Sequence, residues 1–163
     1  MGGGMTMKAR FPMLAVSACL AGVACRYNGE PYPVEALVKL VEAGDALPVC
    51  PERLGGLASP RNPVEWRDGR AVDEDGGDWT EAFQQGAAVG AQIVAAVGCS
   101  GAVLKARSPS CGCGCIYDGS FSHRRIEGDG AFGRLLKAAG VEVITEEADV
   151  AAFLRRHCGD GHE

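Results

Sequence analysis

Residues 13–17 have the sequence MLAVS, a short apolar run that ends in small residues. Such a run is typical of a strand that is buried on both faces, as the strands of parallel sheets are. Comparable short apolar runs follow at Ala46–Val49, Ala102–Lys105 and Val141–Ile144. The sequence therefore predicts four buried strands.

Segments with helical spacing of apolar residues separate these runs, and they cover Val34–Ala43, Asp78–Val97, Ala131–Ala139 and Glu147–His157. Gly44 and Gly140 are suited to end two of these helices, and Asp78 is a candidate N-cap of the long one. Strands that alternate with helices indicate βαβ units. We therefore expect an α/β fold, a single compact domain with a mostly parallel, Rossmann-like sheet flanked by helices.

The segments between these elements carry turn signals. Asp68-Gly69 within Trp66–Gly77 predicts a small hairpin or an extended excursion. We expect loops at Cys19–Pro33, Pro51–Pro63 and Tyr117–Gly130. The predicted domain covers residues 8–157, with a disordered start at residues 1–7 and a frayed tail at residues 158–163.

Charge and hydropathy exclude several classes of protein. The formal net charge of −5 argues against an extended nucleic-acid surface, which needs a basic stripe, although a small nucleobase ligand is compatible with it. No apolar run reaches the roughly 18 residues that cross a bilayer. Residues 16–19, VSAC, are similar to a lipoprotein cleavage site, but the apolar run around them is short and contains Pro12. We expect a cytoplasmic protein, with a lipid-anchored exported one as the alternative; the oligomeric state stays open.

Eight cysteines are spread along the chain. A chain of this length folds without disulfides, so this many thiols in a reducing compartment indicate metal or redox chemistry. Cys19 follows the first predicted strand, Cys50 ends the second, and Cys111 lies in the loop after the third. Because the carboxyl ends of parallel strands meet at one edge of the sheet, these thiols can converge there. Three thiolates leave one position on a metal open, and thiolate-only sites favour iron–sulfur clusters or zinc.

A second pattern is the run Cys111-Gly-Cys113-Gly-Cys115, whose two-residue period would suit a local metal clip. The absence of a CxxC pair argues against a thioredoxin motif and against a zinc ribbon. We expect Cys25, Cys99 and Cys158 not to be ligands. The histidines have no ligand spacing and are expected to face solvent: His123, His157 and His162.

Several blocks of the sequence resemble the bacterial thiouracil desulfidase family. They occur in the family's order and span about residues 13–146, nearly the whole chain. The blocks are SACLAG at residues 17–22, CRYNG at 25–29, PVCPERLGG at 48–56, KARSPSCG at 105–112 and IYDGSF at 116–121.

The resemblance implies a [4Fe–4S] cluster held by Cys19, Cys50 and Cys111, with a fourth iron that lacks a protein ligand. The implied reaction is removal of sulfur from a thiolated nucleobase such as thiouracil. The substrate sulfur would bind the open iron, which polarises the C–S bond as a Lewis acid does. Water then attacks the ring carbon, and hydrogen sulfide and the oxo base are released without net electron transfer, so the enzyme is hydrolase-like.

Other side chains in these blocks are candidates for the reaction and for substrate binding. Glu52, two residues past Cys50, is the candidate acid/base group, with capping of a turn as the alternative. Ser108 and Ser110 are candidates for orienting substrate or water, or they form a Ser-Pro turn. Arg26 and Tyr27 are candidates for holding the base, or they pack the loop.

Lys105 or Arg107 would supply charge at the same edge of the sheet, with a surface role as the alternative. The alternative function is a non-catalytic metal-binding or sulfur-carrying protein that uses the CxCxC segment. Cys113 or Cys115 would also convert the centre to a closed structural or redox cluster if either occupied the open iron.

Overall fold

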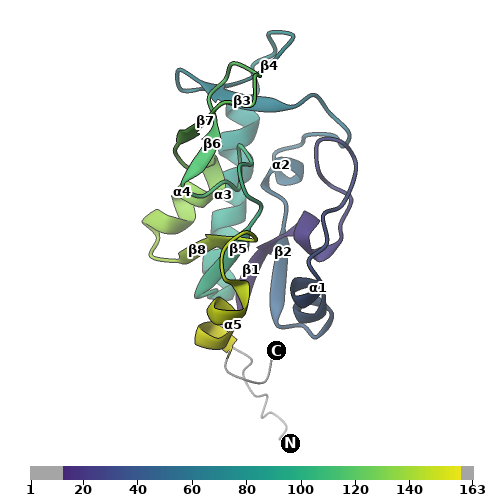
Figure 1. The fold of residues 1–163 in the computed structure, drawn as a ribbon, viewed down its shortest axis with the longest axis vertical. Helices are drawn as coiled ribbons and strands as arrows, with labels where there is room; N and C mark the ends of the chain where they lie inside the picture. Colours follow the sequence, from purple (N-terminus) through teal and green to yellow (C-terminus); the bar gives the residue numbers. More distant parts are fainter. Residues whose placement is uncertain (1–12, 159–163) are drawn as a thin grey trace, which may run out of the picture.

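A computed structural model describes residues 13–158 and shows four parallel strands at its centre (Figure 1). They are β1 (Leu14–Ser17), β2 (Ala46–Val49), β5 (Gly101–Leu104) and β8 (Glu142–Thr145). Their order is β2-β1-β5-β8, and every neighbouring pair is parallel. The predicted α/β fold with a parallel sheet is confirmed. The expected disordered start and most of the expected frayed tail, residues 159–163, lie outside the described residues.

Helices cover both faces of this sheet, and the alternation of side chains along β1 shows why. Leu14 and Val16 pack into one core cluster with α1 (Glu35–Glu42) and α5 (Val150–Cys158). Ala15 packs into the other with α3 (Thr80–Val97) and α4 (Ala131–Ala138). Because β1 is apolar on both faces, it can only be buried between two layers of helices.

Two small antiparallel ribbons lie outside the main sheet. Of the predicted hairpin or extended excursion, the structure shows the hairpin, β3 (Val64–Arg67) and β4 (Arg70–Asp73), with Asp68 and Gly69 both at positive φ in its turn. It lies at the opposite end of the molecule from α5 (Figure 1). The ribbon β6 (Cys115–Tyr117) and β7 (Arg125–Glu127) falls partly in the segment expected to be a loop. The prediction was wrong there because β7 is three exposed residues with one apolar side chain, which gives no strand pattern.

Two helices begin later than predicted, because side-chain hydrogen bonds at their N-termini decide where they start. The long helix begins at Thr80, and Asp78 instead accepts hydrogen bonds from the Thr80 amide and hydroxyl, at 3.0 and 2.6 Å. The last helix begins at Val150 because the Asp149 carboxylate accepts the Ala152 amide at 3.0 Å.

His157 was expected to face solvent, but its side chain is 13% exposed and contacts Ser100 and Glu142.

Two short helices occupy segments expected to be loops, and both adjoin the sheet edge. The 3-10 helix η2 (Ala18–Ala21) follows β1 directly, and α2 (Pro51–Leu54) follows β2. Helix α2 lies close against α3, since a Cβ on Gly86 would stand 1.9 Å from the Pro51 carbonyl oxygen. A Cβ on Gly55 would stand 2.2 Å from the Ala82 carbonyl oxygen. Only glycine allows this approach, which fixes α2 beside the sheet.

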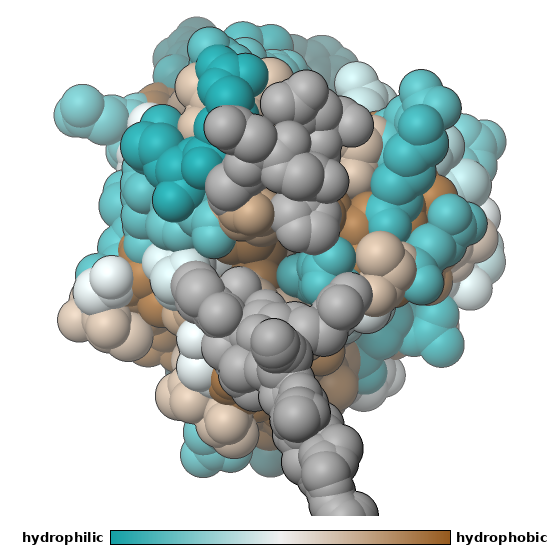
Figure 2. All heavy atoms as spheres, turned by 90° about the horizontal axis from the view of Figure 1, so that it is seen from below, coloured by the Kyte–Doolittle hydropathy of each residue, from teal (hydrophilic) through white to brown (hydrophobic). Residues whose placement is uncertain are grey.

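The face of the molecule seen from below is mixed in hydropathy (Figure 2). Seen from below, hydrophilic and hydrophobic side chains are interspersed (Figure 2). None of the helices in residues 13–158 combines the length and apolar character of a membrane span.

Candidate metal centre

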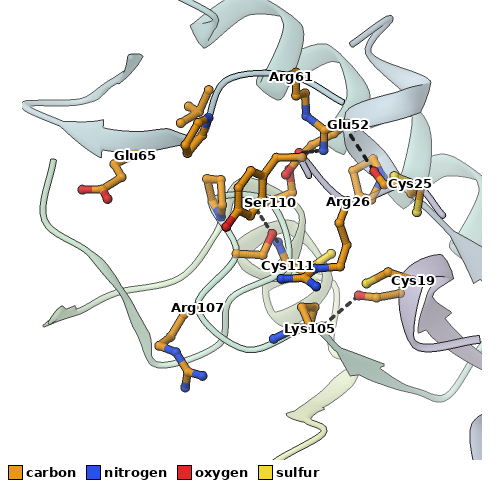
Figure 3. A pocket seen from close by; sticks show the side chains of 18 of the residues that line it. Cys19, Cys25, Arg26, Glu52, Arg61, Glu65, Lys105, Arg107, Ser110 and Cys111 are labelled. Atoms are coloured by element: carbon orange, nitrogen blue, oxygen red, sulfur yellow. Dashed lines mark hydrogen bonds and ion pairs between the residues drawn. The ribbon is translucent and has the colours of Figure 1, made fainter. Parts of the chain in front are cut away.

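Three cysteines lie beyond the carboxyl ends of three neighbouring strands, in the order β2-β1-β5. Cys50 is the N-cap residue of α2, Cys19 lies in η2, and Cys111 lies in the loop that follows β5. All three line one cavity of about 570 Å³. The sequence-based expectation that these residues share one crevice therefore agrees with the structure. Figure 3 shows Cys19 and Cys111 in this cavity.

The Cys19 thiol is buried and lies near positively charged side chains. The residue is 6% exposed, and burial raises the pKa of its thiol to about 11. The charges of Lys105 and Arg26 act in the opposite direction on the same pKa. A buried thiol of this kind loses its proton when a metal cation binds next to it, because attraction to the cation offsets the cost of burying the thiolate charge.

Cys111 is held by a tight turn built from Ser108. The Ser108 hydroxyl oxygen accepts the backbone amides of Ser110 and Cys111, at 3.1 and 3.0 Å. The turn packs against Gly130, where a Cβ would stand 2.4 Å from the Ser110 carbonyl carbon. Burial raises the pKa of the Cys111 thiol, and a hydrogen bond with Ser17 opposes that shift.

A fourth thiol, Cys25, lines the same cavity. It was expected to be a non-ligand, and the structure shows it buried with its thiol hydrogen-bonded to Cys50. This bond lowers the pKa of Cys50 and raises the pKa of Cys25. The spacing of the cysteines did not predict the contact between Cys25 and Cys50. The signal in the sequence that could have found Cys25 is its place in the CRYNG block.

Glu52 is a buried carboxylate with two partners. It forms an ion pair with Arg61, and the Ser110 hydroxyl donates to its Oε2 at 2.9 Å. Arg61 also donates to the carbonyl oxygens of Cys25 and Ala58, at 3.3 and 2.9 Å. Sequence reasoning missed Arg61 because it lies in a Pro/Gly-punctuated loop with no motif around it. The arrangement holds Glu52 in the cavity wall rather than in solvent (Figure 3).

Positive charge lines another part of the wall. Lys105 pairs with Glu146 at 3.0 Å, and its side chain is 14% exposed. Arg26 and Tyr27 both line the cavity, with the guanidinium 5.8 Å from the Tyr27 ring centre. Arg107 instead pairs with Glu147 at 2.8 Å, which raises its pKa, and it points away from the thiols (Figure 3).

Sequence comparison identifies the family of this chain. The sequence model of the 2-thiouracil desulfurase family matches residues 14–148, which contain all the cavity residues described above. The chain belongs to this family. The resemblance seen in the sequence blocks is therefore confirmed.

Two relatives of this 2-thiouracil desulfurase family member cover most of its length. The uncharacterized protein YbbK of Bacillus subtilis (strain 168) is 42% identical over 144 residues, which are 82% of this chain and 95% of the relative. A solved structure, the [4Fe-4S]-dependent thiouracil desulfidase TudS, superposes with a TM-score of 0.82 at 38% identity. It matches 88% of this chain and 97% of its own chain.

The donor set of this desulfurase family member suits an iron–sulfur cluster better than a single metal ion. Within residues 13–158, no three His, Cys, Asp or Glu side chains gather closely enough to bind one ion. Thiols that are spread around a cavity suit a larger group of several irons, and thiolates are the ligands such clusters take. Cys113 and Cys115 are absent from the cavity lining, and the Cys113 thiol contacts the Val143 carbonyl oxygen at 3.6 Å.

Proposed function

We propose that this protein is an iron–sulfur-dependent desulfidase that converts a thiolated nucleobase such as thiouracil to the oxo base and hydrogen sulfide. The observation that carries the proposal is the meeting of Cys19, Cys50 and Cys111 at one cavity that also contains Glu52. The similarity to TudS, a [4Fe-4S]-dependent thiouracil desulfidase, supports the same cofactor and the same class of substrate. The reducing cytoplasm is the compartment that suits thiols of this kind.

The three cysteines would hold a [4Fe–4S] cluster with one iron free of protein ligands. When bound, such a cluster supplies a soft Lewis acid that suits the sulfur atom of a thiocarbonyl group. Cys25 stays hydrogen-bonded to Cys50 and is not one of the proposed ligands.

Glu52 is the proposed acid/base group. Its carboxylate takes a proton from the water that attacks the ring carbon and returns a proton to the departing sulfur or to a ring nitrogen. Ser110 fixes Oε2 and Arg61 fixes Oε1, so the carboxylate cannot rotate freely. The oxygen of water replaces sulfur on the ring, and no electrons are gained or lost.

Arg26, Tyr27 and Lys105 are the proposed substrate-binding residues. Arg26 and Lys105 carry hydrogen-bond donors and no acceptors, so they suit the carbonyl oxygen of the base. The Tyr27 ring supplies a flat apolar face for the base. Ser108 forms the turn that positions Cys111 and Ser110, and it orients water only through that turn.

The test is anaerobic reconstitution with iron and sulfide, followed by a sulfide-release assay with 2-thiouracil. We expect a brown protein that absorbs near about 400 nm and releases one sulfide for each uracil formed. A brown protein that releases no sulfide would remove the substrate assignment and leave the cluster assignment standing.

Single Cys→Ser variants test the ligand set. We expect Cys19→Ser, Cys50→Ser and Cys111→Ser to lose bound iron. Cys99→Ser is the matched control, because Cys99 is buried, as Cys19 and Cys111 are, but does not line the cavity. Loss of iron in Cys113→Ser and Cys115→Ser, with iron retained in the first three variants, would instead support the CxCxC alternative.

A further inference from the structure

Tyr32 is an aromatic residue of the cavity wall that has no part in the function proposed above. It lies in the segment between the CRYNG block and α1, outside any helix or strand. Its backbone amide donates to the carbonyl oxygen of Cys19 at 3.0 Å, which joins this segment to η2. The backbone of Tyr32 is thereby held beside η2, which carries the proposed ligand Cys19.

Two cations approach the same Tyr32 ring. The Lys105 Nζ lies 4.5 Å from the ring centre, and the Arg26 Cζ lies 5.5 Å from it. A cation near an aromatic face is attracted by the negative potential of the ring. The ring therefore offsets part of the repulsion between two like charges that share one wall of the cavity.

The two cations differ in their other partners. Lys105 also pairs with Glu146, so the ring and a carboxylate both hold it. The Arg26 guanidinium makes no ion pair or hydrogen bond with another residue of the 13–158 range, and only the Tyr27 and Tyr32 rings hold it. Its donors are therefore available to a ligand, but its position depends on aromatic contacts.

We propose that Tyr32 is a positioning residue that holds Arg26 and Lys105 side by side for substrate binding. This inference rests on the proposed function, in which these two side chains bind the acceptor edge of the base. Without the ring, Arg26 samples other rotamers and must be ordered again when substrate binds. Removal of the ring thus weakens substrate binding and leaves the reacting groups, Glu52 and the three thiols, in place.

The kinetic test compares Tyr32→Leu with Tyr32→Phe in reconstituted protein. Tyr32→Leu should raise the KM for 2-thiouracil roughly five- to thirtyfold, with kcat and iron content unchanged. Tyr32→Phe keeps the π face and should restore the wild-type KM. Val23→Ala is the matched control, because it truncates an exposed apolar side chain of the same loop outside the cavity lining.

Three kinetic outcomes overturn the inference. An unchanged KM in Tyr32→Leu shows that the ring positions nothing, and an equal loss in Tyr32→Phe shows that the hydroxyl carries the effect. A fall in kcat with unchanged KM shows that Tyr32 acts on the reaction rather than on binding. If Tyr32→Leu does not fold, Tyr32→Met replaces it as the variant without a ring.

A second measurement needs no activity. Protons that lie over an aromatic face are shifted upfield in NMR spectra, so the Arg26 Hδ and Lys105 Hε signals should be shifted upfield in the wild type and in Tyr32→Phe. In Tyr32→Leu the Lys105 Hε shift should disappear, whereas the Arg26 Hδ shift should only decrease, because the Tyr27 ring remains near Arg26. If the wild type releases no sulfide but these shifts are present, the proposed reaction fails while the positioning contact stands; if the shifts are absent, the positioning role itself is overturned.

Discussion

The Glu52 carboxylate is the residue on which the proposed proton transfers depend, and each of its oxygens has a partner of a different kind. Arg61 is a charged partner, whereas Ser110 is a neutral hydroxyl that belongs to the turn preceding Cys111. The carboxylate therefore connects α2 with the loop after β5. A change at Glu52 or Ser110 should affect the reaction, while a change at Ser108 should affect the loop.

We predict that Glu52→Gln lowers the rate of sulfide release by about 10²- to 10⁴-fold, because an amide cannot accept and return a proton. Iron content should stay at the wild-type level, since Gln keeps the size and shape of the side chain. The measurement is sulfide release per bound iron. Glu81→Gln, a change to an exposed carboxylate outside the cavity, should leave the rate unchanged; a comparable rate for Glu52→Gln would contradict the assigned role.

Ser108→Ala and Ser110→Ala should have different consequences. Ser110→Ala removes one hydrogen bond to a charged group and should lower sulfide release about ten- to hundredfold with iron retained. Ser108→Ala leaves the amides of Ser110 and Cys111 without their shared acceptor, so it should lower the iron content itself. Iron analysis beside the activity assay separates the two effects, and the reverse pattern would exchange the two roles.

At this scale, the sequence predicted the residues that follow directly from strand ends. That Cys19, Cys50, Cys111 and Glu52 line one cavity could be predicted because each lies within a few residues of a buried strand or in the loop that follows it. Arg61 could not, because its ion pair with Glu52 depends on how a loop of Pro and Gly residues folds back. Contacts of that kind are set by three-dimensional turn geometry, which residue spacing does not encode.

Among the elements, α2 has the largest influence on the site relative to its length. Its four residues follow Cys50 and include Glu52, and it is too short to be stable alone. Its position depends on contact with α3, where Gly55 and Gly86 allow backbone to approach backbone. Helix α3 thus supports α2.

We predict that Gly86→Ala destabilises the protein despite the higher helix propensity of alanine. The gain of about 1 kcal/mol in propensity is outweighed by a Cβ placed against the Pro51 carbonyl oxygen. A net loss of about 2–3 kcal/mol would lower the melting temperature by roughly 5–10 °C. The displaced α2 should also reduce iron binding.

The neighbouring substitution Gln85→Ala is the control for Gly86→Ala. Gln85 is exposed on the same turn of α3, so its truncation should leave both the melting temperature and the iron content unchanged. Thermal unfolding and iron analysis of the two variants make the comparison. A melting temperature for Gly86→Ala equal to or above that of the wild type would show that α2 can move aside without cost.

Elements were predictable where a pattern repeats over enough residues. The four central strands are short but continuous in apolar character, and α3 is long enough to show its spacing. The ribbon β6–β7 and helices η2 and α2 have three or four residues each, so their backbone is decided by packing and pairing rather than by their own sequence.

Considered as a whole, the molecule gathers the proposed ligands from segments that the sheet alone brings together. Strand β1 lies between β2 and β5, so its end is next to the ends of both neighbours. A cluster bound to Cys19, Cys50 and Cys111 would connect η2, α2 and the loop after β5. It would cross-link these segments in the folded state only, and it would therefore stabilise that state relative to the unfolded chain.

We predict that loading the cluster raises the melting temperature by roughly 5–10 °C relative to the iron-free protein. Anaerobic thermal unfolding before and after reconstitution measures the shift. Cys111→Ser, treated in the same way, should show no shift. An equal melting temperature for loaded and iron-free wild type would mean that the cysteines do not hold the group across the three segments.

The central place of β1 has a consequence for how the protein matures in the cell. Cys19 leaves the ribosome early, but β5 and Cys111 must follow before the sheet can bring all three donors together. A nascent chain that ends before β5 lacks Cys111, so the proteins that assemble clusters would find only two of the three proposed ligands. If Cys19, Cys50 and Cys111 are the ligands, as proposed, iron delivery is therefore expected only after β5 and Cys111 have been synthesised and β5 has paired with β1.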